Sequence, residues 1–417
     1  MTGDLPVSAR GTESPAESWV QHLRAGGTTP WPRWVREAGA SDGREAPPTA
    51  GTVAGVPGAA QLELLRRLNE LGPVPHRADH VLGRPGPGRG PVHLALPLDP
   101  LGPPAPRREV LRVAAGVLAD LAAQLPAPAQ GRRRRRARRA RPAEGVPAFV
   151  LEGPPITVAE VRARLAAAGM PEHRPRFSWL GARPDPGPDI AVVLVAPLDE
   201  ALRQVWAARV QRGAGRAWSS FVAQWAGRGS LPPSAAVDRV AGYWADRLGD
   251  GNVHLVAISQ PAADPAAVVA RVLGRPVDAG PAEVPEVAPE EPVRLAPAVV
   301  DVLRRVNVVL PFVCPETDRA PRRTALVGLA REISAHPGPV DLPKQRRRWA
   351  GSTASRLVDA LAETGCVRHG DFEALRATGP ATDRRLGGGE VLDVMVRMIH
   401  RVDAELTGAS RDGRGGR

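Results

Sequence analysis

The chain has 417 residues and is 43% apolar, which is enough for a buried core and favours two or three domains, so a fully disordered protein is excluded. Glycine and proline number 44 and 46, more than usual, which indicates that some segments are linkers. The net charge of +12 is concentrated in one segment, GRRRRRARRARP at 131–142, whose eight arginines leave only +4 for the rest of the chain. We therefore expect a folded body that is close to neutral.

Cys314 and Cys366 are the two cysteines, too few for a disulfide framework and without the spacing of a metal site. The N-terminus has no basic start followed by an apolar run, and the longest apolar stretch, 190–198, is too short to cross a membrane. These features predict a cytoplasmic protein with no metal, no targeting segment and no membrane span. They do not indicate an oligomeric state.

The beginning of the chain predicts little regular structure. Residues 1–57 are rich in Gly, Pro, Ser, Thr and Ala, so we expect a disordered arm that carries a patch of three tryptophans, Trp19, Trp31 and Trp34. Residues 58–91 predict a short amphipathic helix that ends at Gly72, followed by a Pro/Gly linker.

Four apolar runs then predict buried strands, at 92–96, 148–151, 190–196 and 253–258. Helical patterns lie between and after them, at 107–125, 158–168, 200–210, 235–248 and 266–273. Strands that alternate with helices predict an α/β fold, with a parallel sheet covered by helices. We assign this core to residues 92–275, with the Arg-rich stretch 126–147 as an insertion.

The acidic, proline-rich segment 276–292 predicts a linker at the end of the core. Residues 293–406 are expected to be a helical C-terminal part of the same fold, and residues 407–417 a disordered tail. The expected helices in this part span 298–310, 322–335, 345–364 and 390–406.

The stretch DIAVVLVAPLDEALRQVWAARVQRG at 189–213 resembles the strand and following helix of actinobacterial sulfotransferase-like proteins. Further likenesses follow in the family's order, at 219–225, 239–258, 299–310 and 347–376. The resemblance covers about residues 90–406. It implies a P-loop nucleotide-type fold and the sulfate donor PAPS, which the family binds with the backbone amides, lysine and hydroxyls of a Pro-Lys-Thr-Gly-Thr-Thr loop.

The corresponding loop in this chain is LPLDPLGPP at 96–104, and it lacks that chemistry. Proline offers no N–H to a phosphate and carries no charge. Ala196 also stands where the family has an arginine, after the strand at 190–195. We therefore expect a vestigial donor site and no bound cofactor. The residues of this expected vestigial site are Pro100, Leu101, Gly102, Pro103, Pro104 and Ala196.

Three functional hypotheses follow. The first is a degenerate sulfotransferase-like protein without PAPS-dependent transfer, which acts as a binding protein for a protein or an acidic polymer. The second is an active sulfotransferase with a remodelled donor site, acting on an envelope glycan or lipid. Its phosphate contacts would come from Arg203, Arg384, Arg385, Gly387, Gly388 and Gly389.

The third hypothesis is a polyanion-binding scaffold, in which the arginine run supplies salt-sensitive affinity through counterion release. The alternative is a solvated insertion loop. No aromatic residues interleave with the arginines, which disfavours nucleic acid as the partner. The run consists of Arg132, Arg133, Arg134, Arg135, Arg136, Arg138, Arg139 and Arg141.

The remaining chemistry-bearing residues are expected to be structural. His93 and His254 lie in predicted strands and His173 and His369 in predicted loops, and none has a catalytic partner at a diagnostic spacing. The tryptophans at 206, 218, 225 and 244 fall among helices, where such residues usually pack in the core.

Overall fold

The computed structural model describes residues 15–31, 33–34, 59–72, 81–82, 106–126, 146–173, 188–258, 264–275, 291–334, 341–376 and 386–412. The chain divides into two compact units. The helical unit combines Met1–Gln124 with Gly387–Arg417, and the sheet unit is Leu125–Leu386. The sheet unit is therefore inserted into the chain between two parts of the helical unit.

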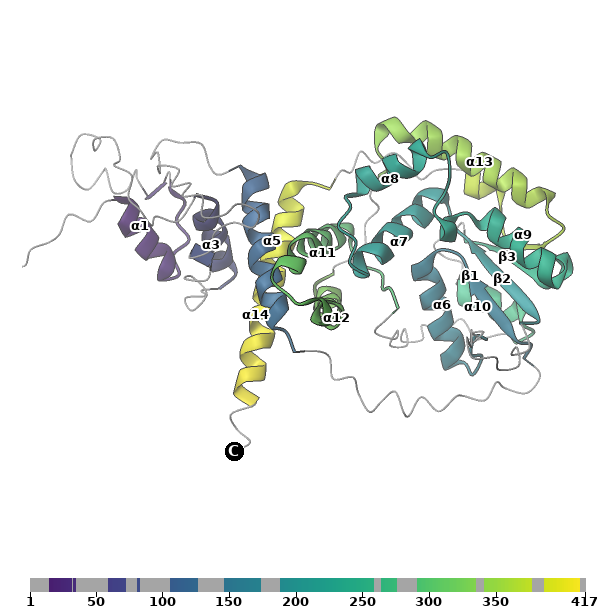
Figure 1. Ribbon diagram of the computed structural model, residues 1–417, viewed down its shortest axis with the longest axis horizontal. Helices are drawn as coiled ribbons and strands as arrows, with labels where there is room; N and C mark the ends of the chain where they lie inside the picture. The colour runs from purple at the N-terminus through teal and green to yellow at the C-terminus, as the bar shows by residue number, and fades with distance from the viewer. Residues whose placement is uncertain are drawn as a thin grey trace, which may run out of the picture. The chain divides into compact units, whose positions relative to one another are not determined.

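The main helices of the described helical unit are α1 (Pro15–Arg24), α3 (Ala59–Leu71), α5 (Arg107–Gln124) and α14 (Gly388–Asp412). The helices α5 and α14 lie side by side (Figure 1), and a Cβ on Gly388 would stand 3.6 Å from Leu111 in the first turns of α5. An ion pair between Arg67 and Asp393, at 3.3 Å, joins α3 to α14. The segment of α5 was expected in the core 92–275 and most of α14 in the helical C-terminal part of the same fold, whereas the structure places both in the helical unit.

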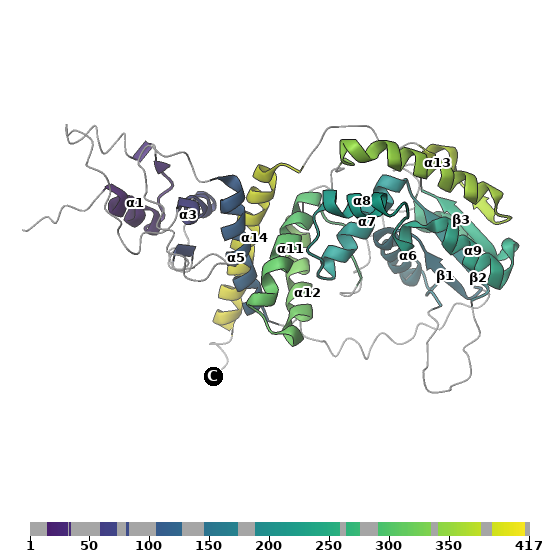
Figure 2. The same cartoon turned by 45° about the horizontal axis from the view of Figure 1, so that its top comes forward.

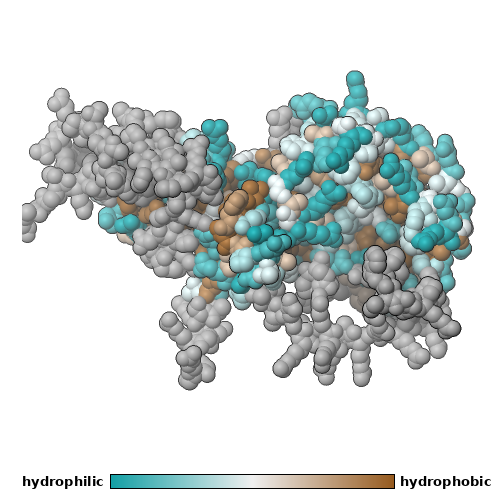
Figure 3. Space-filling view, in the orientation of Figure 1, coloured by the Kyte–Doolittle hydropathy of each residue, from teal (hydrophilic) through white to brown (hydrophobic). Residues whose placement is uncertain are grey.

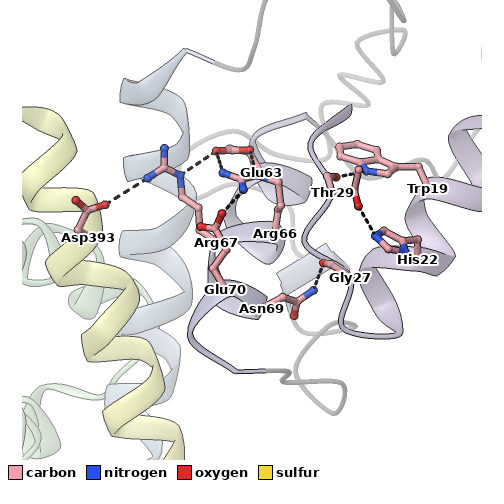
Figure 4. A network of polar contacts seen from close by, with 10 residues as sticks. All are labelled: Trp19, His22, Gly27, Thr29, Glu63, Arg66, Arg67, Asn69, Glu70 and Asp393. Carbon is pink, nitrogen blue, oxygen red and sulfur yellow. Dashed lines mark hydrogen bonds and ion pairs between the residues drawn. The ribbon is translucent and has the colours of Figure 1, made fainter. Parts of the chain in front are cut away.

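Residues 15–31 are ordered, and the helix α1 lies among them, so the expectation of a disordered arm is wrong for this segment. Trp19 and Leu23 are buried, and the buried amide of Asn69 on α3 donates hydrogen bonds to the carbonyls of Leu23 and Gly27, both at 2.8 Å. The indole of Trp19 donates to the Thr29 carbonyl at 2.8 Å (Figure 4). The segment is ordered because α3 covers its apolar side; residues 1–14, 32 and 35–57 lie outside the described residues.

In the described residues, the sheet unit contains a parallel sheet of four strands in the order β1-β2-β3-β4. Neighbouring strands pair in the register Phe149↔Ile190, Ala191↔Val253 and His254↔Val367. The strands are β1 (Phe149–Glu152), β2 (Ile190–Val195), β3 (Val253–Ala257) and β4 (Val367–His369). Three of them confirm predicted strands, and the predicted strand at 92–96 lies outside the described residues.

The strand β4 lies between the expected helices 345–364 and 390–406, where the sequence predicts a loop. It has only three residues, Val-Arg-His, without the apolar run that marks the other strands, because it is exposed at the edge of the sheet. The helix α8 (Trp218–Gly227) is likewise absent from the helices that the sequence predicts. At the C-terminus, α14 continues to Asp412, so residues 407–412 are helical and not part of the expected disordered tail; residues 413–417 lie outside the described residues.

Helices cover both faces of the sheet, which confirms the predicted α/β class. Side chains alternate along β2, so that Val192 and Leu194 pack with α6 and α10, whereas Ala191, Val193 and Val195 pack with α9 and α13. Figure 2 shows β1, β2 and β3 side by side with α6 and α9 next to them. The covering helices are α6 (Pro155–Ala167), α9 (Val237–Leu248), α10 (Pro265–Val272) and α13 (Arg347–Glu363).

Three further helices complete the described sheet unit: α7 (Leu198–Gln211), α11 (Pro297–Val309) and α12 (Glu316–Ile333). The side chain of Asn307 on α11 donates to the carbonyls of Val210 and Ala214, at 2.7 and 3.1 Å, and so binds the C-terminal end of α7. The exposed surface over α13 is mostly hydrophilic (Figure 3). No helix in the described part of the chain is both long and apolar enough to span a bilayer.

Asp301 on α11 gives a testable pH dependence. Burial alone would raise the pKa of this carboxyl, but hydrogen bonds and charge from Arg304 at 2.6 Å and Arg305 at 2.8 Å outweigh it and lower the pKa. A depressed native pKa contributes stability above the unfolded pKa, about 3.9, and this stability is lost as the pH falls through the native pKa.

Asp301→Asn is therefore expected to lower the free energy of unfolding at pH 7 by about 1–3 kcal/mol. The difference from the wild type should shrink below about pH 4, where Asp301 becomes protonated in the unfolded wild-type chain. Urea unfolding of both proteins at several pH values measures this. A difference that stays constant down to pH 2 would contradict the assigned ion pairs.

Candidate functional site

The candidate site is the carboxyl edge of the sheet, where ligands bind in open parallel α/β sheets. Two neighbouring strands end there and are each followed at once by a helix. After β1, Gly153 and Pro154 lead into α6, and after β2, Ala196 and Pro197 lead into α7. Two helix N-termini are thus placed side by side at this edge.

Gly153 brings the first of these turns against the backbone of β2. Its φ of +128° is one that L side chains rarely adopt, and a Cβ at this position would stand 2.4 Å from the carbonyl oxygen of Leu194. The turn between β1 and α6 therefore packs directly on β2. The contact between Gly153 and β2 therefore fixes the position of the N-terminus of α6.

The N-terminus of α6 has few donors left for a ligand. A helix N-terminus binds anions through its unpaired backbone N–H groups. Pro154 is the N-cap and Pro155 the first helical residue, and neither has an N–H. The N–H of Thr157 donates to Oε1 of Gln204 on α7, at 2.9 Å. An amide of the chain itself thus occupies the position where an anion would bind.

Gln204 is held on both sides. Its Oε1 also accepts from the Thr157 hydroxyl at 3.1 Å, and its Nε2 donates to Oε1 of Glu200 at 2.9 Å. Gln204 and Thr157 are 3% and 5% exposed, so this bonding takes place out of water. We call these three residues, Thr157, Glu200 and Gln204, the amide plug.

Carboxylates dominate the start of α7. Burial would raise the pKa of Glu200, but the charges of Arg203 and Arg294 and the hydrogen bond from Gln204 lower it, so it remains ionised. Burial raises the pKa of Asp199 more strongly than Arg203 lowers it. Arg203 forms ion pairs with both carboxylates, at 3.2 Å to Asp199 and 2.9 Å to Glu200. A phosphate brought to this edge would meet the ionised carboxylate of Glu200.

The predicted site residues lie in different parts of the structure. Ala196 directly follows β2 and is buried, and Arg203 is ion-paired with Asp199 and Glu200 of its own helix. Gly387, Gly388 and Gly389 stand at the start of α14 in the helical unit, not in the sheet unit. Arg384 and Arg385, the loop 96–104 and the arginine run 132–141 lie outside the described residues.

The sequence alone did not reveal the amide plug or the contact of Gly153 with β2. A usable signal was present in FVLEGPPITV at 149–158, where an apolar strand runs through Gly-Pro-Pro straight into a helix. No local sequence pattern indicated the hydrogen bond between Gln204 and Thr157, because the two residues are 47 positions apart in the chain. Trp244 on α9 was expected in the core and does pack there, partly buried.

The structure also brings two histidines together. Nδ1 of His254 on β3 lies 3.0 Å from Nε2 of His369 on β4, with the rings 27° apart. Burial and the neighbouring His369 lower the pKa of His254, and burial lowers that of His369. This contact links β3 to β4. Among the described residues, no cluster of three or more metal-ligating side chains occurs.

Removing the plug amide should destabilise the sheet unit. Gln204→Leu leaves the buried N–H of Thr157 without an acceptor, and we expect the free energy of unfolding to fall by about 1–3 kcal/mol. Gln224→Leu is the matched control, because Gln224 is half-buried on α8 and its side chain has no hydrogen bond within the described residues. Denaturant unfolding should show a larger loss of stability for Gln204→Leu than for Gln224→Leu. Equal losses in the free energy of unfolding would contradict the hydrogen bonds assigned to the amide plug.

No family model, no curated protein and no solved structure matches the chain.

Proposed function

We propose that this chain is a degenerate sulfotransferase-like protein that binds a partner and does not catalyse sulfate transfer. The observation that carries the proposal is the amide plug, because Gln204 takes up the Thr157 N–H at the N-terminus of α6. The resemblance at 189–213 supplies the family, and the replacement of the family's donor-binding residues at 96–104 and at Ala196 points the same way.

The residues at this edge do not suit a phosphosulfate donor. Two prolines remove N–H groups, and the ionised Glu200 would repel a phosphate. Arg203 and Arg294, the cations that contact Glu200, are each ion-paired with carboxylates. The residues at this edge are therefore better suited to binding a partner than to holding a donor for sulfate transfer.

Titration with PAP, the desulfated donor, tests this proposal. Calorimetry on the full chain at low and moderate salt should show no saturable binding up to millimolar PAP. A variant that lacks residues 131–142 is the control, because the arginine run would bind any phosphate weakly and lose it as salt is added. Salt-resistant micromolar affinity in both proteins would overturn the proposal and favour an active enzyme.

A further inference from the structure

Two large apolar side chains are exposed together at the end of α11. Phe312 is 82% exposed and Val308 is 51% exposed. Both lie on the segment formed by α11 and the short helix Leu310–Phe312, and Pro311 between them is also exposed. We call Val308, Pro311 and Phe312 the Phe312 knob. Their neighbours Val309 and Leu310 are buried and anchor the segment in the core.

Contacts from two other elements hold the knob in place. On one side, a Cβ on Gly215 would stand 2.8 Å from Val308, so the loop between α7 and α8 lies directly against it. On the other, Arg319 of α12 donates to the carbonyls of Pro311 and Cys314, at 3.1 and 3.0 Å. The exposed position of Phe312 is thus part of a fixed structure.

The same two elements carry an excess of positive charge. Arg323 donates to the carbonyl of Arg212 at 2.8 Å, which brings α12 to the end of α7. Burial and the nearby Arg319 lower the pKa of Arg323. The Nε atoms of Arg322 and Arg323 are buried and have no hydrogen-bond partner within the described part of the chain.

Five arginines on these elements have no ion-pair partner among the described residues, and we call them the arginine group. Glu316 and Asp318, in the first turn of α12, are the nearby carboxylates in the sequence, so cations outnumber anions. The arginine group is Arg212, Arg216, Arg319, Arg322 and Arg323.

We propose that the Phe312 knob and the arginine group form a peripheral docking site for a bilayer surface that carries anionic lipid headgroups. A basic surface with a protruding apolar residue binds such a surface by charge attraction together with burial of the apolar side chain at the acyl boundary. Phe312 is the one aromatic ring of the knob, beside the aliphatic Val308 and Pro311, whereas binding of single strands uses several aromatic rings on which successive bases stack; this favours lipid over single-stranded nucleic acid. This site is separate from the amide plug, so it stands or falls independently of PAP binding.

Co-sedimentation of the full chain with vesicles tests the proposal. We expect binding to phosphatidylcholine vesicles that contain phosphatidylglycerol, weakening with added salt, and none to phosphatidylcholine alone. Phe312→Ser should lower the partition coefficient at least tenfold. The pair Arg212→Gln and Arg216→Gln should lower it about fivefold for each arginine.

Matched controls exist on other elements of the sheet unit. Arg239→Gln with Arg271→Gln makes the same change in charge at two exposed arginines of α9 and α10, and Tyr243→Ser removes an exposed aromatic ring from α9. All three substitutions should leave the partition coefficient within about twofold of the wild type. Circular dichroism and thermal unfolding would verify that each variant is folded.

Several results would overturn the proposal. Equal binding of Phe312→Ser and the wild type would show that the knob takes no part. Binding that disappears when residues 131–142 are deleted would assign it to the arginine run. An equal fall in the partition coefficient of the control variants would show that the effect comes from net charge and not from this site. Binding of single-stranded DNA that depends on Phe312 would identify nucleic acid as the partner instead.

Discussion

Gly153→Ala is expected to lower the free energy of unfolding of the sheet unit by about 3 kcal/mol or more. Two costs combine at this position. The φ of +128° is strained for any residue with a Cβ, and the added methyl would meet the Leu194 carbonyl oxygen at 2.4 Å. That oxygen belongs to the backbone of β2 and cannot rotate away, so the strand itself must shift. Urea unfolding followed by circular dichroism measures the loss.

Gly328→Ala on α12 is the matched control. Gly328 is helical, and a Cβ there would meet nothing within 4 Å apart from the helix's own backbone. Alanine should stabilise this helix by about 0.4–1 kcal/mol, because it restricts the unfolded chain. The two substitutions add the same methyl group and should change stability in opposite directions. If Gly153→Ala were as stable as Gly328→Ala, the turn between β1 and α6 would not have the described geometry.

Phe221→Ala on α8 is expected to cost about 3–5 kcal/mol. The ring is 2% exposed and lies between two tryptophans, with its centroid 6.0 Å from that of Trp218 and 6.5 Å from that of Trp225. Arg209 also packs over it at 5.7 Å. Alanine would lose this burial and leave a cavity among large rings that cannot collapse easily. Unfolding measured by tryptophan fluorescence reports on the same cluster.

Phe312→Ala provides the comparison within the same residue type. Its ring is 82% exposed, so truncation should change stability by no more than about 0.5 kcal/mol. A large loss at Phe312 would show that the ring is buried in solution. A small loss at Phe221 would show that the cluster on α8 is loosely packed.

The strands and helices that the sequence predicted correctly are those with strong apolar patterns. The strands β1, β2 and β3 are continuous buried runs, so their type could be read directly. The strand β4 could not, because its three residues are held by pairing with β3 and not by an apolar pattern of their own. The helix α1 escaped prediction because its cover, Asn69 and the leucines of α3, comes from about forty residues further along the chain.

The site was predicted less completely than the fold. The sequence identified Ala196 as a position without charge and Arg203 as a cation beside it. The sequence could not show that Arg203 forms an ion pair with Glu200, or that Gln204 of α7 bonds to Thr157 of α6. Such pairings depend on the crossing of α6 and α7, which no local pattern records.

The division of the helical unit between the two ends of the chain sets the order in which the protein can fold during synthesis. The ribosome completes α5 and then adds about 260 residues before α14 emerges. At about 5–20 residues per second, α5 waits roughly 10–50 s for this neighbour. During that time the side chains that α14 will cover, Leu111 among them, remain without that partner. The sheet unit is complete first, and the uncovered side of α5 stays open to contacts with chaperones or other chains until the last segment arrives.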